Sequence, residues 1–211
     1  YLTHTHFDHI CGLPFFAPFY LQQNRFRVWA GHLAPLTTRD AVATLMSAPI
    51  FPVNPEIFKA AVAYCDYTGG ATLTPFDGVA LKTAPLNHPN GATGYRIEYG
   101  GRSICYITDM EHPDKGVDER VRQLIAGCDV FIYDASYTDE EYPEKKGYGH
   151  STWRAGLELA VRAGVKQYVL FHHDPAHTDE KMDAIMREAE AAGRERGIKT
   201  LAAREGLTIA P

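Results

Sequence analysis

The feature that most constrains this chain is a cluster of metal-ligating side chains at residues 4–9, HTHFDH. Three imidazoles and one carboxylate lie within six consecutive positions. In an extended segment, residues two apart point to the same side, so His4 and His6 can hold one ion. Asp8 and His9 follow where the chain must turn, and they can face a second ion. Imidazole nitrogens with a carboxylate oxygen suit zinc, manganese or iron.

Strand and helix patterns alternate along the chain, which predicts an α/β fold. Strands are expected at residues 25–31, 79–84, 93–100, 102–109, 129–135 and 167–173, with two short strands closing the chain. Helices are expected at residues 38–47, 54–65, 117–127, 152–163 and 178–196. The length of 211 residues fits one domain, which we place over residues 1–211.

Tyr1–Thr3 reads as the end of a buried strand. Such a strand needs neighbours on either side to satisfy its backbone. We therefore expect that the N-terminal strands of the fold are missing from this sequence.

Three further ligand-type residues each follow a predicted strand. They stand in the segments Asn87-His88-Pro89, Ile107-Thr108-Asp109 and Val169-Leu170-Phe171-His172. A single histidine after a strand is more often packed or solvated than functional. The three together, all at carboxyl ends of strands where loops gather, indicate one site.

The pattern H-x-H-x-D-H resembles the signature of the metallo-β-lactamase superfamily, and the strand-end motifs follow in that family's order over nearly the whole chain. The resemblance implies a four-layer αβ/βα sandwich with a dinuclear metal centre at one edge. It implies these metal ligands: His4, His6, Asp8, His9, His88, Asp109 and His172. It further implies a hydrolase with two divalent ions, Zn²⁺ first and Mn²⁺ or Fe²⁺ as alternatives. Asp8 would also orient or deprotonate the attacking water.

The histidine pair His172-His173 leaves one ligand open. Alternation along a strand makes the two side chains point apart. The family often has a proline three residues after its ligand, and Pro175 stands in that position relative to His172. We therefore predict His172 as the ligand, with His173 as the alternative.

A second motif indicates which class of hydrolysis reaction the chain catalyses. Gly149-His150-Ser151-Thr152, followed by a helix and a strand that ends in histidine, resembles the ribonuclease Z-like phosphodiesterase branch. In that branch, this histidine contacts the phosphate or the leaving group and pairs with a carboxylate. Here the carboxylate would be Asp134, in the segment 133–136 (YDAS), which departs from the branch's His-Glu-Ala-Thr at three of four positions. The resemblance implies catalytic roles for Asp8, His150 and Asp134.

The composition limits the partners. The net charge is −5 and there is no Lys/Arg-rich block, which argues against a long nucleic acid and favours a small or cyclic nucleotide-like phosphodiester. The basic, glycine-rich arm of ribonuclease Z is also absent. No apolar run is long enough to span a membrane. Four separated cysteines favour a reducing, cytoplasmic setting. A homodimer is compatible with all of this.

Other readings stay open on the same residues. Lactones, carboxylic esters or β-lactams could be hydrolysed at the same metal site, and a metal-binding regulatory domain or a redox diiron protein are further alternatives. The aromatic segments around residues 14–20 and 49–52 are either core or the wall of a substrate pocket. His32 and His177 have no motif context and are expected at the surface, and His112 is expected in a solvated loop.

Overall fold

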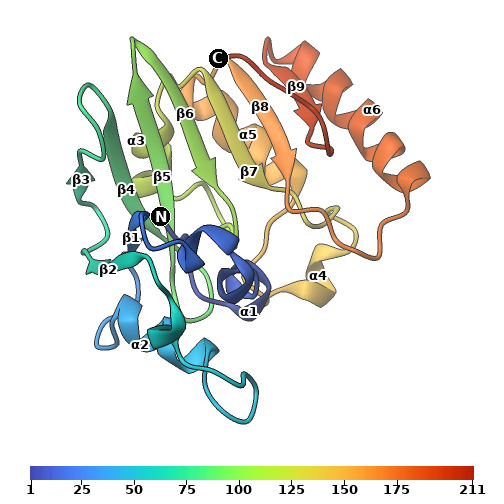
Figure 1. Ribbon diagram of the computed structural model, residues 1–211. Helices are drawn as coiled ribbons and strands as arrows, with labels where there is room; N and C mark the ends of the chain where they lie inside the picture. Colours follow the sequence, from blue (N-terminus) through green and yellow to red (C-terminus); the bar gives the residue numbers. More distant parts are fainter. The chain divides into compact units, whose positions relative to one another are not determined.

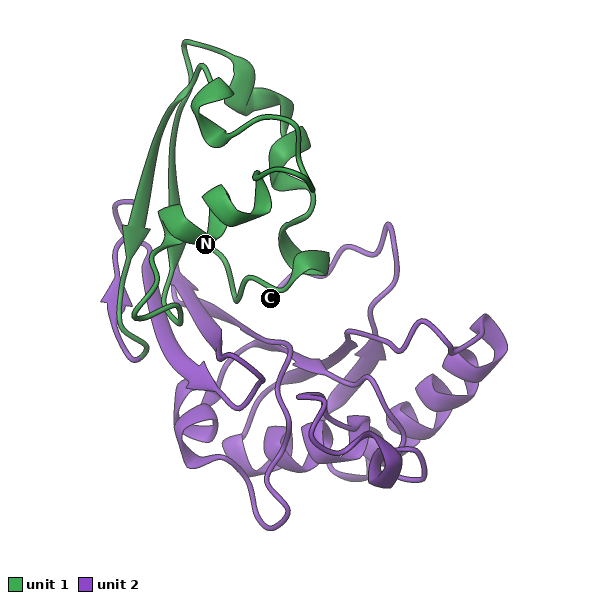
Figure 2. Cartoon of the chain, turned by 90° about the horizontal axis from the view of Figure 1, so that it is seen from below, with its two compact units in different colours: residues 1–69 green, residues 70–211 purple.

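The computed structural model describes residues 1–211. The chain divides into two compact units, Tyr1–Gly69 and Gly70–Pro211 (Figure 2). This division follows contacts within the chain, and the expectation of one domain over residues 1–211 stays a prediction.

The first unit is built on two parallel strands, β1 (Arg25–Ala30) and β2 (Ala61–Asp66). Its short helices are α1 (Phe7–Ile10), η1 (Leu13–Phe15), η2 (Ala17–Tyr20), α2 (Thr38–Leu45) and η3 (Pro55–Ile57). Helix α2 begins at a capping box, in which the Thr37 hydroxyl accepts from Asp40 N while the Asp40 carboxylate accepts from Thr37 N. Buried Phe19 packs against the rings of Phe16, Phe26 and Phe58.

The helix expected over residues 54–65 is wrong. Asn54 does cap a helix start, but only the single 3₁₀ turn Pro55–Ile57 follows before the chain extends into β2. The segment Ala61–Asp66 gains a full parallel ladder with β1, which outweighs its local helix preference. At its end, Asp66 Oδ1 accepts from both the backbone N and the hydroxyl of Thr38, at 2.7 Å each. Pairing with β1 thus makes residues 61–66 a strand, although the helix-capping residue Asn54 had led us to expect a helix there.

The start of the chain also differs from expectation. Tyr1–Thr3 is not a strand, although Leu2 N donates to Trp29 O of β1 at 2.8 Å. The Tyr1 ring stacks on Trp29 at 5.8 Å between centroids.

The second unit holds a seven-stranded sheet in the order β3-β4-β5-β6-β7-β8-β9 (Figure 1). The strands are β3 (Thr72–Leu73), β4 (Ala80–Leu86), β5 (Ala92–Tyr99), β6 (Arg102–Ile107), β7 (Val130–Asp134), β8 (Gln167–Phe171) and β9 (Lys199–Ala202). Strands β3 to β6 are antiparallel neighbours, and β6 to β9 are parallel neighbours. Of the two closing strands expected, only β9 forms.

Four helices belong to this unit: α3 (Glu119–Ile125), α4 (Tyr142–Lys145), α5 (Trp153–Ala163) and α6 (Asp179–Glu195). The three longer helices α3, α5 and α6 lie along one face of the sheet (Figure 1). Helix α5 begins at the Thr152 cap and ends at Gly164 in the left-handed conformation, as the sequence predicts. Trp153 and Leu157 of α5 bury against Phe131 and Tyr168 of the sheet. No helix of the chain has the length and apolar character needed to cross a bilayer.

The sheet topology decides where a site can form. Because β4 and β5 are antiparallel and β5 and β6 are antiparallel, β4 runs in the same direction as β6, β7 and β8. The carboxyl ends of these four strands therefore meet at one edge. His88, Asp109, Asp134 and His172 stand at those ends.

Candidate metal centre

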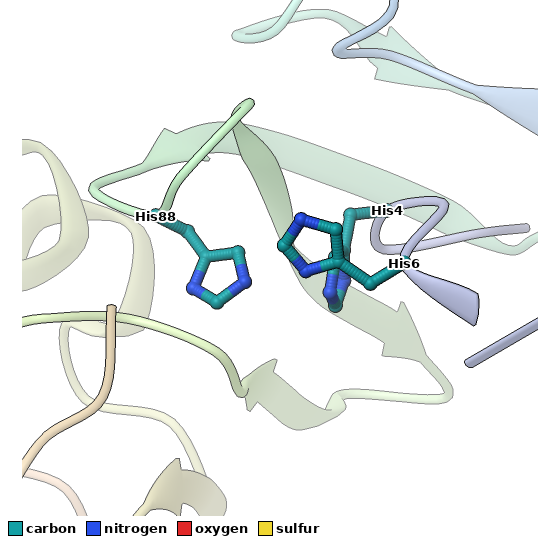
Figure 3. Close-up of side chains that lie close together, drawn as sticks. All are labelled: His4, His6 and His88. Atoms are coloured by element: carbon teal, nitrogen blue, oxygen red, sulfur yellow. The ribbon is translucent and has the colours of Figure 1, made fainter. Parts of the chain in front are cut away.

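In the first unit, three imidazoles gather before and within α1. The ring of buried His4 lies beside that of His6 (Figure 3), with 4.6 Å between the ring centroids. The centroid of the His9 ring is 4.2 Å from that of His4. His6 is extended and occupies the position before α1, so the chain turns into a helix directly after it. The Asp8 carboxylate is mostly exposed, with Oδ2 3.2 Å from His9 Nε2. Alternation thus brings His4 and His6 together as expected, the turn into α1 adds His9, and the Asp8 carboxylate stays mostly exposed.

In the second unit, His88 lies in the loop after β4 (Figure 3). Its Nδ1 is 2.8 Å from the carbonyl oxygen of Gly149. A carbonyl only accepts, so Nδ1 of the neutral ring carries the proton and Nε2 is left as a ligand atom. Gly149 has φ +87°, and a Cβ there would come within 2.4 Å of His88 Nδ1. The close approach of the backbone therefore requires glycine at this position.

Two of the predicted ligands sit in strained backbone. Asp109 has φ 57° and His172 has φ 59°. Asp109 is buried; its Oδ2 accepts from the Thr108 hydroxyl at 2.9 Å, and its Oδ1 faces His172 Nε2 at 3.2 Å. Positive φ at residues other than glycine costs energy, and such strain gathers at functional sites.

The contacts just after β8 favour His172 over His173 as the ligand. The His172 ring faces Asp109, whereas His173 Nε2 is 3.2 Å from the carbonyl oxygen of Ala203. Burial lowers the pKa of His173, so this ring is held neutral beside a backbone acceptor. The two side chains point apart as predicted, but the reason differs: both residues lie after β8 (Gln167–Phe171), and the left-handed backbone of His172 turns the chain there.

Asp134 and His150 form a pair. Asp134 Oδ2 lies 2.8 Å from His150 Nδ1, and the carboxylate is fully buried. The same carboxylate accepts from the backbone N of Met110, Ser136 and Ser151. These bonds hold the carboxylate in one orientation, so it in turn fixes the His150 ring.

The donor atoms of this edge fit a divalent ion. One ligand atom each from His88, Asp109 and His150 lies within 4.8 Å of the other two, and the same holds for Asp134, His150 and His172. Nitrogen and hard oxygen donors in such groups suit a borderline ion such as zinc. His150 belongs to both groups, and its ring stacks on that of His172 at 4.8 Å.

Other polar residues at this edge are ones that the sequence analysis did not predict. Ser136 contacts both Asp134 and His172. Glu111 Oε2 accepts from the backbone N of Gly147 at 2.8 Å and of Gly149 at 3.0 Å. The roles of Ser136 and Glu111 depend on contacts between segments far apart in the sequence. The only local signal is that each residue stands two positions after a predicted site residue, Asp134 or Asp109.

Three histidines expected in solvent are not there. The His177 side chain is 3% exposed, and its Nε2 pairs with Glu141 at 3.1 Å. His32 lies 6.5 Å from His4 between ring centroids, with its Nδ1 buried. His112 is half-buried, with Nδ1 2.8 Å from the Ser151 hydroxyl, and burial lowers its pKa. In each case a partner distant in sequence holds the ring, which a reading of local motifs does not reveal.

Comparison with known proteins relates both units to one family. A model of the β-lactamase superfamily domain matches residues 1–173. Ribonuclease Z of Brevibacillus brevis is 30% identical over 95 residues, which cover 45% of this chain and 28% of that protein. Ribonuclease Z of Gemmatimonas aurantiaca is 24% identical over 258 residues, which cover 99% of this chain and 78% of that protein.

Solved structures agree on the fold. The metallo-β-lactamase fold protein YhfI of Bacillus subtilis aligns with a TM-score of 0.70 at 16% identity, over 97% of this chain and 74% of that one. The short form of human tRNase Z aligns at 0.66 and 19% identity, over 99% and 77%. Zn²⁺-bound PqqB of Methylobacterium extorquens aligns at 0.66 and 17% identity, over 99% and 71%. Since the family model covers most of the chain, the protein belongs to the β-lactamase superfamily and has its mixed α/β fold.

Proposed function

We propose that this protein is a metal-dependent hydrolase with a dinuclear centre. His4, His6 and His88 would hold one ion, Asp8, His9 and His172 the other, and Asp109 would lie between them. The observation that carries the proposal is the gathering of His88, Asp109, His150 and His172 at one sheet edge. The imidazole cluster of residues 4–9 would supply the remaining donors, and a single family model matches both segments. Zn²⁺ fits this donor set first, with Mn²⁺ and Fe²⁺ as alternatives.

The substrate we propose is a small or cyclic nucleotide-like phosphodiester. The His150–Asp134 pair supports this choice, because phosphodiester cleavage builds charge on the non-bridging oxygens and on the leaving oxygen. The likeness to ribonucleases Z points to the same kind of bond. A net charge of −5 speaks against a long polyanion and leaves a small substrate as the better fit.

The residues of the chain would divide the work. Bound divalent ions supply a nucleophile at neutral pH and stabilise negative charge on the substrate. Asp8 would orient the attacking water or take its proton. The Asp134 carboxylate accepts from His150 Nδ1 and so turns Nε2 outward, where it can donate to the leaving oxygen. With five hydrogen-bonding groups around it, Asp134 has little freedom to release the ring.

The test combines metal analysis with a substrate panel. Elemental analysis of purified, zinc-reconstituted protein should find close to two ions per chain. The loaded protein should hydrolyse bis(p-nitrophenyl) phosphate and cyclic nucleotides faster than a lactone or a chromogenic β-lactam. If the protein takes up neither zinc nor manganese, the proposal of a dinuclear centre is wrong. Faster turnover of the carbonyl substrates would move the assignment to a lactone, ester or β-lactam hydrolase on the same site.

A further inference from the structure

Ser136 is a buried hydroxyl with three close neighbours at the carboxyl edge of the sheet. Its Oγ lies 2.8 Å from Asp134 Oδ1, 2.6 Å from the carbonyl oxygen of His172 and 3.0 Å from His172 Nδ1. The parallel register of β7 and β8 sets Asp134 beside Phe171, so the residues just beyond each strand meet. Only 3% of Ser136 is exposed, which leaves water little part in these contacts.

The protons around Ser136 can be assigned from its neighbours. The hydroxyl has one proton to donate, and two of its neighbours, the Asp134 carboxylate and the His172 carbonyl, can only accept. The oxygen is therefore left to accept at its third contact, and the donor there is His172 Nδ1–H. In a neutral imidazole the other nitrogen, Nε2, then carries the lone pair. Nε2 faces Asp109 Oδ1 at 3.2 Å, and two electron-pair donors so placed suit a cation that both can bind.

We propose that Ser136 is a positioning residue that fixes the tautomer and orientation of His172 for metal binding and ties this ring to the Asp134–His150 pair. The inference rests on the proposed function, since His172 is a proposed ligand there. Partners of the nitrogen that does not bind metal generally orient a histidine ligand and raise its basicity. Through Ser136, one buried carboxylate thus braces two rings, His150 directly and His172 through the hydroxyl.

Loss of the hydroxyl should act on the metal site before it acts on the fold. In Ser136→Ala, the oxygen that accepts the hydrogen bond from His172 Nδ1–H is lost. The ring can then take the other tautomer or rotate. The strand ladder between β7 and β8 does not involve the Ser136 side chain. Ser103→Ala is a matched control, because Ser103 is also buried and its hydroxyl also bonds a carboxylate, Asp129, at 3.2 Å. Ser103 is the second residue of β6, at the end of the strand away from Asp109.

Isothermal titration calorimetry, with zinc added to the metal-free chain of residues 1–211, tests the inference. Ser136→Ala should weaken one of the zinc sites by roughly 10- to 100-fold, the usual effect of removing such a partner. Ser136→Thr keeps the hydroxyl and should restore the affinity, and Ser103→Ala should leave it unchanged. An alanine variant that binds zinc as tightly as the wild type would overturn the proposal.

A spectroscopic measurement on the wild type stands even if the alanine variant fails to fold. Nitrogen NMR of ¹⁵N-histidine-labelled, zinc-loaded protein should show His172 protonated at Nδ1 and coordinated through Nε2. Coordination of His172 through Nδ1, or a zinc-loaded His172 without a proton on Nδ1, would contradict the role of Ser136. A wild type that binds no zinc would instead count against the proposed function.

Discussion

At the scale of single residues, Gly149 carries the strictest requirement. Its carbonyl orients His88, and a Cβ would lie 2.3 Å from Pro89 Cδ and 2.4 Å from His88 Nδ1. Gly149→Ala should therefore displace the His88 ring, weaken zinc binding and destabilise the fold. Nearby Gly147 also has positive φ, at +92°, but a Cβ there meets nothing within 4 Å.

Gly147→Ala is therefore the control for backbone strain alone. We expect Gly149→Ala to cost about 1–3 kcal/mol more than the control in urea unfolding, since overpacking adds to the shared strain. Zinc affinity should fall only in Gly149→Ala. Equal losses in the two variants would show that the contact with His88 does not constrain the site.

His150 offers a second prediction at this scale. His150→Ala should lower phosphodiester turnover by about 10²–10⁴-fold, the range for a positioned general acid. Asp134→Asn should give part of this loss, because the amide would no longer hold an imidazolium. Metal content, measured by elemental analysis, should stay at the wild-type level in His150→Ala. Loss of an ion from this variant would instead make His150 a ligand, and unchanged turnover would remove it from catalysis.

The sequence predicted the types of residue at the site better than their partners. His88, Asp109 and His172 could be placed at strand ends because the strand patterns are local. Ser136 and Glu111 could not, because their roles depend on which strands and loops are neighbours in the sheet. His177 shows the same limit, since its partner Glu141 is 36 residues away in the chain.

At the scale of elements, Glu111 links the loops of the site. Its carboxylate accepts from the backbone of Gly147 and Gly149, while its own N donates to Asn87 O at 2.8 Å. Glu111→Ala should loosen the loop that carries His150 and lower turnover by roughly 10- to 100-fold through misplacement. Exposed Glu144, whose side chain has no hydrogen-bond partner, provides Glu144→Ala as the control. Steady-state kinetics with equal rates for both variants would contradict this link.

Most elements followed from local patterns, and the exceptions have a common cause. Strands β4 to β8 and helices α3, α5 and α6 lie close to the predicted ranges, because their apolar periodicity and caps are strong. Residues 61–66 carry no strong period, so a capped start at Asn54 suggested a helix. Pairing with β1 decides their conformation, and the pairing is a contact between distant segments.

An ion pair between buried Asp129 and exposed Lys166 lies at the amino ends of β7 and β8, the ends opposite to the candidate site. Asp129 accepts from Lys166 Nζ and from Ser103 N, both at 2.7 Å. The Lys166 hydrogen bond, with the Ser103 backbone, outweighs burial and lowers the pKa of Asp129 to about 2, from an ordinary 3.8. Because the pKa is lower in the folded state than in the unfolded state, the Asp129 carboxylate stabilises the folded protein at pH values above 3.8. This stabilisation is lost as the pH falls toward about 2.

Asp129→Asn should therefore be less stable than the wild type at neutral pH, and the gap should shrink between about pH 4 and pH 2. Urea unfolding of the metal-free protein at several pH values measures the gap. Asp183→Asn, at an exposed carboxylate without partners, should show no such trend. A gap for Asp129→Asn that stays constant down to pH 2 would contradict the lowered pKa.

At the scale of the whole molecule, the metal ions of the proposed centre should contribute to the stability of the folded chain. An ion that binds only the folded chain stabilises it by mass action, by about 4 kcal/mol at a free concentration 1,000 times its Kd. For a chain of this size, each kcal/mol shifts Tm by about 2–4 °C. Removing the metal with a chelator should thus lower Tm by roughly 8–16 °C.

Metal removal should also make the chain easier to digest. Limited proteolysis should cut chelated protein faster than zinc-loaded protein, because local opening governs cleavage. His6→Ala lacks a proposed ligand and should respond less to the chelator in both measurements. If chelation changes neither Tm nor the cleavage rate of the wild type, no metal ion stabilises the folded chain, and the proposed centre is wrong.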